Sequence, residues 1–83
     1  FGSQRMDIQI EEIRIPDNST LAGKTLEGAE IRKRTGVMIV ALKKIDGTMT
    51  FSPAPEEVLC AGDHLIAIGS AGDLEKLEVL AGM

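Results

Sequence analysis

Residues 37–42 read VMIVAL, an unbroken apolar run, and Asp46-Gly47 follows after a short polar stretch. Such a run is typical of a strand that is buried on both faces, or buried on one face and packed against a partner chain on the other. Asp-Gly is a strong signal for a tight turn between antiparallel strands. We therefore expect a hairpin whose returning strand carries Met49 and Phe51 and stops before the prolines of residues 53–55.

Two further strands are expected on either side of this hairpin in the chain. Residues 65–68 read LIAI and follow a sharp turn at residues 61–63, so they form a second strand that is apolar on both faces. Residues 6–15 alternate between apolar and polar, with a change of phase at Glu11-Glu12. We interpret that change as a β-bulge or bend within one long strand.

Two helices complete the expected architecture. The first is amphipathic, spans residues 24–34 and ends at Gly36, a residue suited to a helix C-terminus. The second follows Ser70, which has Asp73 three residues on, as in a capping box, and its core face lies within residues 74–81. The resulting order is β-α-β-β-β-α, an α+β domain in which helices pack on a small sheet.

Composition limits what this chain does. It has 83 residues and one cysteine, so we expect one small domain in residues 6–83, with residues 1–5 as a linker or cloning remnant. A single cysteine forms no intrachain disulfide framework and fits a reducing, cytoplasmic compartment. No apolar run is long enough to insert directly into a membrane. A domain of this size buries a modest share of its surface and gains from a partner.

No cluster in the sequence has the composition of a catalytic or metal site. His64 is the only histidine, and we expect it to be partly exposed and structural, whereas Cys60 is expected to be a small buried residue. A Cys60–His64 pair lacks the third group of a nucleophilic site. Gly23-Lys24-Thr25 imitates the end of a phosphate-binding loop but lacks the glycine that should precede it. We therefore predict that the domain is not an enzyme.

The charge distribution leaves two interpretations of one basic cluster. The net charge is −4 and aromatic residues are scarce, so we expect no nucleic-acid partner. Arg32-Lys33-Arg34 is the only dense basic group, at the expected end of the first helix. It is either a solvated basic helix end or an anion site, in which two such ends hold one symmetric anion across a dimer.

The order of short motifs resembles a known family. Residues 13–16 (IRIP), 21–26 (LAGKTL), 34–43 (RTGVMIVALK) and 61–70 (AGDHLIAIGS) are similar in sequence and spacing to the C-terminal lobe of RCK domains, the TrkA-C domain. The resemblance extends over about residues 6–81, nearly the whole chain.

That resemblance implies a cytosolic regulatory lobe of a potassium channel or potassium-uptake system. The lobe would form a homodimer, follow a Rossmann-like N-terminal lobe, and act on a membrane pore or transporter subunit. It would have no cofactor of its own, and its regulatory ligand, cyclic di-AMP or a divalent cation, would bind between protomers and gate cation transport. The alternative is a ligand-free assembly module of another ion transporter or permease.

The resemblance also points to individual residues. Ile31 and Arg32 occupy the isoleucine-arginine position that lines the cleft in members that bind cyclic di-AMP. Met38 stands where those members often carry an asparagine, so a hydrogen bond to a base edge is lost. In calcium-gated members, carboxylates such as Glu30 or Asp46 would serve instead, although calcium prefers about six to eight oxygen ligands. With the basic helix end, the expected ligand-binding residues are Ile31, Arg32, Arg34, Met38, Ser52 and Pro53.

Overall fold

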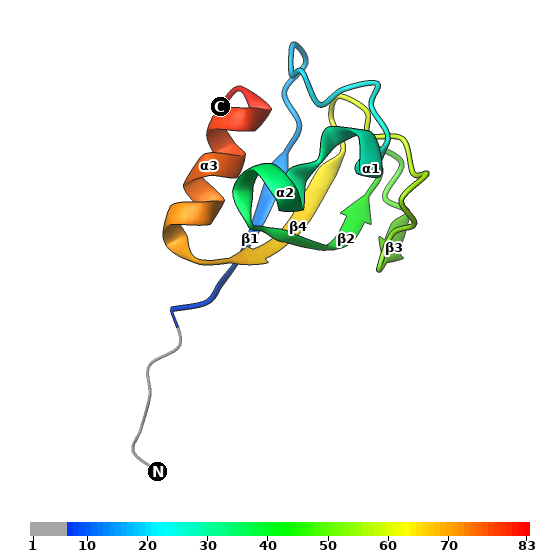
Figure 1. Ribbon diagram of the computed structural model, residues 1–83. Helices are drawn as coiled ribbons and strands as arrows, with labels where there is room; N and C mark the ends of the chain where they lie inside the picture. The colour runs from blue at the N-terminus through cyan, green and yellow to red at the C-terminus, as the bar shows by residue number, and fades with distance from the viewer. Residues whose placement is uncertain (1–6) are drawn as a thin grey trace.

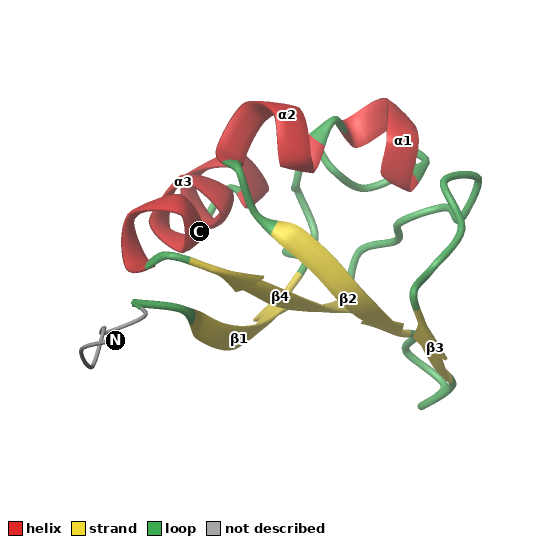
Figure 2. Ribbon diagram, turned by 60° about the horizontal axis from the view of Figure 1, so that its bottom comes forward, coloured by secondary structure: helices red, strands yellow, loops and turns green. Residues whose placement is uncertain are grey.

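The computed structural model describes residues 7–83, in which a four-stranded antiparallel sheet carries helices on one face (Figures 1 and 2). The strands are β1 (Gln9–Arg14), β2 (Met38–Lys43), β3 (Met49–Phe51) and β4 (His64–Gly69), in the spatial order β1-β4-β2-β3. The helices are α1 (Leu26–Ala29), α2 (Ile31–Thr35) and α3 (Ala71–Ala81). The α+β class is confirmed, and the predicted linker of residues 1–5 lies outside the described residues.

The two apolar runs form the centre of the sheet. β4 pairs with both β1 and β2, which places Ile13, Leu65 and Leu42 in one cross-strand row. All three are buried, as are Leu74 and Leu77 of α3, and all belong to one core cluster. The core therefore lies between the sheet and the helices, and none of the helices in residues 7–83 is long and apolar enough to cross a membrane.

The β-bulge predicted at Glu11-Glu12 is wrong. All six residues of β1 pair with β4 in continuous register, and the irregularity lies in β2 instead, between Ile39 and Ala41. The change of phase has another cause, because the early isoleucines Ile8 and Ile10 are exposed to solvent while the later ones are buried. The apolar side chains of this strand thus belong to two faces of one regular strand.

The single helix predicted over residues 24–34 is wrong, because two short helices take its place. Glu30 has a left-handed backbone (φ 51°, ψ 39°), which interrupts the helix between α1 and α2. α1 begins after Thr25, whose hydroxyl accepts a hydrogen bond from the Gly28 N–H at 2.9 Å. α2 ends at Gly36 (φ 85°), the C-terminal glycine that the sequence predicts.

The predicted turn and cap at the other junctions are confirmed. Asp46-Gly47 lies in the turn that joins β2 to β3, with Gly47 in the left-handed region (φ 91°). The Ser70 hydroxyl accepts a hydrogen bond from the Asp73 N–H at 3.1 Å and so caps α3.

The turn before β4 is organised by a buried carboxylate. Asp63 is only 1% exposed, and its Oδ2 accepts the Cys60 N–H at 2.9 Å and pairs with the Lys44 ammonium. Burial lowers the pKa of Lys44, but the Asp63 carboxylate outweighs burial and leaves that pKa raised. Cys60 itself is exposed, so its predicted burial is wrong, because only its backbone is drawn into the turn.

Candidate ligand-binding site

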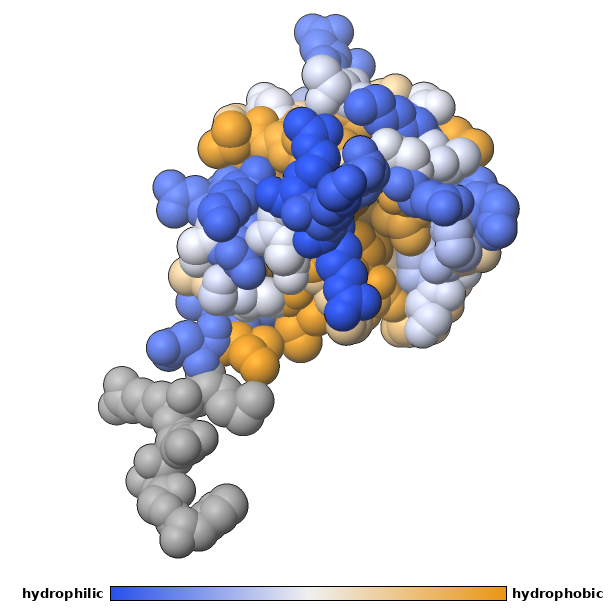
Figure 3. Space-filling view, viewed as in Figure 1, coloured by the Kyte–Doolittle hydropathy of each residue, from blue (hydrophilic) through white to orange (hydrophobic). Residues whose placement is uncertain are grey.

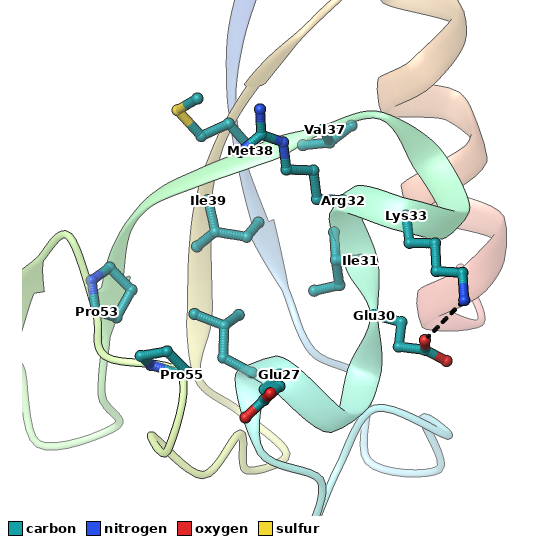
Figure 4. A pocket seen from close by; sticks show the side chains of 11 residues that line it. Glu27, Glu30, Ile31, Arg32, Lys33, Val37, Met38, Ile39, Pro53 and Pro55 are labelled. Carbon is teal, nitrogen blue, oxygen red and sulfur yellow. Dashed lines mark ion pairs between the residues drawn. The ribbon is translucent and has the colours of Figure 1, made fainter.

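A groove of about 500 Å³ lies where α1, α2, the start of β2 and the segment after β3 meet (Figure 4). Its walls come from residues 26–39 and from the segment of Pro53 and Pro55, which is distant in sequence. The groove is lined by Leu26, Glu27, Glu30, Ile31, Arg32, Lys33, Val37, Met38, Ile39, Pro53 and Pro55.

Backbone hydrogen bonds fix the two walls of the groove to each other. The Leu26 N–H donates to the Glu57 oxygen at 2.8 Å, and the Glu27 N–H donates to the Pro55 oxygen at 3.0 Å. α1 is therefore attached to the segment after β3, where the prolines stand. These bonds involve main-chain atoms alone, so they do not depend on which side chains line the groove.

The floor of the groove is apolar. Ile31 and Val37 are buried, and Ile39 is half-buried and packs against the core. In the space-filling view, strongly hydrophilic side chains lie over α2, and apolar surface extends beside them toward β2 (Figure 3). A ligand in the groove would thus meet an apolar floor and a charged rim.

The rim carries four charged side chains that differ in their partners. Lys33 Nζ lies 3.5 Å from Glu30 Oε2, an exposed ion pair that adds little to stability (Figure 4). Arg32 and Glu27 form no ion pair with any residue in the range 7–83. One cation and one carboxylate of the rim are therefore left for a ligand.

The structure brings together most of the residues that the sequence predicts for the site. Ile31, Arg32, Met38 and Pro53 line the groove, whereas Arg34 and Ser52 do not. Arg34 is the next residue of α2 after the lining ones, and the Ser52 N–H donates to the Val40 oxygen at 2.9 Å, as part of the sheet edge.

Sequence reasoning left six of the lining residues out of the expected site, named Lys33 only as part of the basic cluster, and named Glu30 only as a calcium ligand. Pro55 had a weak signal, because it stands two residues from Pro53 in the same segment. Lys33, Val37 and Ile39 adjoin predicted residues in the sequence, whereas Leu26 and Glu27 are brought to the groove by the position of α1. The missed residues are Leu26, Glu27, Lys33, Val37, Ile39 and Pro55.

The two carboxylates considered for calcium are engaged separately. Glu30 faces Lys33 at the groove, and Asp46 lies in the β2–β3 turn. The Asp46 carboxylate accepts the Thr48 N–H at 2.8 Å, and this bond lowers the pKa of Asp46. Within residues 7–83, no three or more histidine, cysteine, aspartate or glutamate side chains are grouped so that they could hold a metal ion.

His64 and Cys60 lie away from the groove. His64 is half-buried, as predicted, and its Nδ1 lies 2.6 Å from Glu12 Oε2 on β1. Neither His64 nor Cys60 is among the groove residues.

Curated relatives of the chain are a potassium channel protein, a potassium uptake protein and an antiporter subunit. It is 44% identical over 64 residues to potassium channel protein 1 of Methanocaldococcus jannaschii, which covers 77% of the chain and 19% of that protein. It is 41% identical over 66 residues to Ktr system potassium uptake protein C of Bacillus subtilis (80% and 29%). It is 34% identical over 76 residues to the ammonium/H⁺ antiporter subunit AmhM of Alkalihalophilus pseudofirmus (92% and 45%). The chain thus spans less than half the length of each of these relatives.

Solved structures agree in fold over most of the chain. The RCK_C domain dimer of S. agalactiae BusR in complex with c-di-AMP has a TM-score of 0.81 and 26% identity, covering 87% of this chain and 93% of that one. The KtrA RCK C domain in complex with c-di-AMP has a TM-score of 0.79 and 32% identity (88% and 82%). S. agalactiae BusR in complex with its busAB-promotor DNA has a TM-score of 0.83 and 25% identity, and this chain covers 39% of that chain. For the present lobe, the absence of a nucleic-acid partner stays a prediction.

A match to the TrkA-C domain family covers residues 10–82 and so includes every helix and all but the first residue of the sheet. The chain therefore belongs to the TrkA-C domain family.

Proposed function

We propose that the groove binds a small anionic regulatory ligand, with cyclic di-AMP as the first candidate, between two copies of this lobe. The observation that carries the proposal is an apolar groove with a cationic side chain, Arg32, that has no ion-pair partner within residues 7–83. The BusR and KtrA domains of the same fold, which are complexed with c-di-AMP, support this choice of ligand.

The chemistry of the groove suits a nucleotide. The guanidinium of Arg32 presents several N–H donors in one plane, which match the oxygens of a phosphate. The apolar floor of Ile31, Val37 and Ile39 suits the faces of a base. The groove is open, so a second copy across a twofold axis would cover the ligand. The two copies would then make the same contacts with the two halves of a symmetric molecule.

In the parent protein, the lobe would act as a cytosolic regulator of a potassium channel or uptake system rather than as an enzyme. The potassium channel and Ktr relatives support this role, and their greater length leaves room for an N-terminal lobe. A ligand biases the gate only if it binds the open and closed arrangements of the dimer with different affinity.

Calorimetric titration with cyclic di-AMP tests the proposal, with arginine variants as a matched pair. Arg32→Ala should weaken binding by about tenfold or more, because charge-assisted hydrogen bonds to phosphate are lost. Arg34→Ala removes the same charge from the same helix outside the groove and should change the dissociation constant by less than about twofold. Absence of binding, or equal losses in the two variants, would contradict the proposal.

A ligand-free assembly module is the second candidate. Met38 favours it, since its thioether offers no strong hydrogen bond to a base edge at the groove, and the antiporter subunit AmhM is a relative from another transport system. Under this alternative, sedimentation would detect a dimer, while titration with cyclic di-AMP or calcium would produce no binding heat.

A further inference from the structure

The groove holds two charges of opposite sign without ion-pair partners in the described chain. Arg32 extends from α2 at one end of the view in Figure 4, and Glu27 stands on α1 at the other. Between them lie Ile31 and Ile39 of the floor. Glu30 differs from Glu27, because the ammonium of Lys33 already faces its carboxylate.

The two ends of the groove would bind groups of opposite hydrogen-bonding character. A guanidinium donates hydrogen bonds and accepts none, so Arg32 selects anionic oxygens. An ionised carboxylate accepts hydrogen bonds and donates none, so Glu27 selects an N–H group and repels a carbonyl oxygen. A ligand that satisfies both ends must carry an anion and an N–H donor on opposite sides of an apolar body.

The middle of the groove favours an apolar body. The isoleucines of the floor face the segment of Pro53 and Pro55, and backbone bonds hold that segment to α1. Apolar side chains on both sides offer no hydrogen bonds to the middle of a ligand. A planar ring with its polar groups on the edge meets these conditions.

We propose that Glu27 is the residue that recognises the base. It accepts a hydrogen bond from an exocyclic amine while Arg32 binds a phosphate. The ligand class is a nucleotide with an amino-bearing base, and a base without an amine in that place loses this hydrogen bond. This proposal rests on the proposed function and adds to it a second contact and a rule of discrimination.

Cyclic di-AMP and its analogue built from purine riboside differ at this group alone, because purine riboside has a hydrogen in place of the adenine amine. The wild-type lobe should bind cyclic di-AMP at least about tenfold more tightly, since the analogue offers no N–H to the Glu27 carboxylate. Glu27→Gln should reduce the preference to about threefold or less, because a neutral amide oxygen accepts this hydrogen bond more weakly than a carboxylate does. Glu56→Gln, which changes an exposed carboxylate outside the groove, is the matched control and should keep the wild-type preference.

The outcomes separate this proposal from the function on which it rests. If the wild-type lobe binds neither dinucleotide, the proposed function fails and Glu27 loses its role with it. If the lobe binds both equally, or if Glu27→Gln keeps the full preference, ligand binding stands and the assignment of Glu27 is overturned. Thermal unfolding should be the same within a few degrees for both glutamine variants, so a loss of fold is detected separately.

Discussion

The two faces of the sheet use similar residues for different purposes. On the face covered by helices, the row of Ile13, Leu65 and Leu42 is buried in the core. On the opposite face, Ile10 of the same strand is 70% exposed, and Phe51 near the sheet edge is 75% exposed. The difference teaches that apolar character alone does not locate the core; strand register and helix position decide which face is buried.

The uncovered face also changes character along the strands. Paired residues of antiparallel strands lie on the same side of a sheet, so the strand register shows which residues belong to the uncovered face. One end is apolar and the other end is charged. The three successive rows are Ile10, Ile68 and Met38, then Glu12, Ile66, Ala41 and Phe51, and then Arg14, His64, Lys43 and Met49.

Adjacent positions of β4 provide the most direct test of this comparison. Leu65→Ala empties a fully buried site and should lower the free energy of unfolding by about 3 kcal/mol. Ile66→Ala, on the uncovered and half-buried side, should cost about 1 kcal/mol. Urea denaturation measures both, and equal costs would mean that the uncovered face is buried in solution by another copy or partner.

A smaller loss of stability is expected when the buried carboxylate beside β4 is removed. Asp63→Ala should lower the free energy of unfolding by about 2 kcal/mol, because it leaves the Lys44 ammonium and the Cys60 N–H without their acceptor. Asp17→Ala removes an exposed carboxylate and serves as the control, with a change below about 0.5 kcal/mol. Thermal or urea unfolding distinguishes them, and similar losses would show that the buried pair does not stabilise the turn.

The smallest effect should appear as a pH dependence where β1 meets α3. The pKa of Glu11 is raised above its ordinary value of 4.5, chiefly by its hydrogen bond with Glu78. The folded protein thus holds this proton more tightly than the unfolded chain, and this contribution to stability is lost as the pH rises through the raised pKa. Glu78→Gln should flatten that decline and add about 0.5 kcal/mol or less at pH 7.

Unfolding between pH 4 and pH 7 checks this prediction, with Glu75→Gln as the control on an exposed position of the same helix. The control should keep the wild-type slope. A Glu78→Gln variant with an unchanged slope would show that the carboxylates of Glu11 and Glu78 do not interact in solution.

The sequence was informative where one local rule determines the structure. The apolar runs became β2 and β4, and Asp46-Gly47 formed the turn of the hairpin. It misled at Glu30, where a residue without a glycine's freedom adopts a left-handed backbone, and no local pattern marks that position. It misled again in β1, because the exposed Ile8 and Ile10 resemble core residues.

The candidate site was less predictable than the fold because tertiary contacts assemble it. Arg32 and Met38 lie near each other in sequence and were found. Glu27 and Pro55 share the groove through a backbone hydrogen bond between segments that are distant in the chain. Arg34 satisfied the sequence pattern equally well, and the course of a very short helix decided that it lies outside.

The main-chain bonds between the groove walls have a consequence for how this domain diversifies. Gly23 N–H donates to the Leu59 oxygen at 2.7 Å, and the Leu59 N–H returns a bond to the Lys24 oxygen at 2.8 Å. These bonds survive any substitution except proline, so the exposed side chains of the rim can be exchanged one at a time while the two segments stay attached to each other. One scaffold can then acquire new ligand preferences through single substitutions at its rim, while the buried floor stays part of the core.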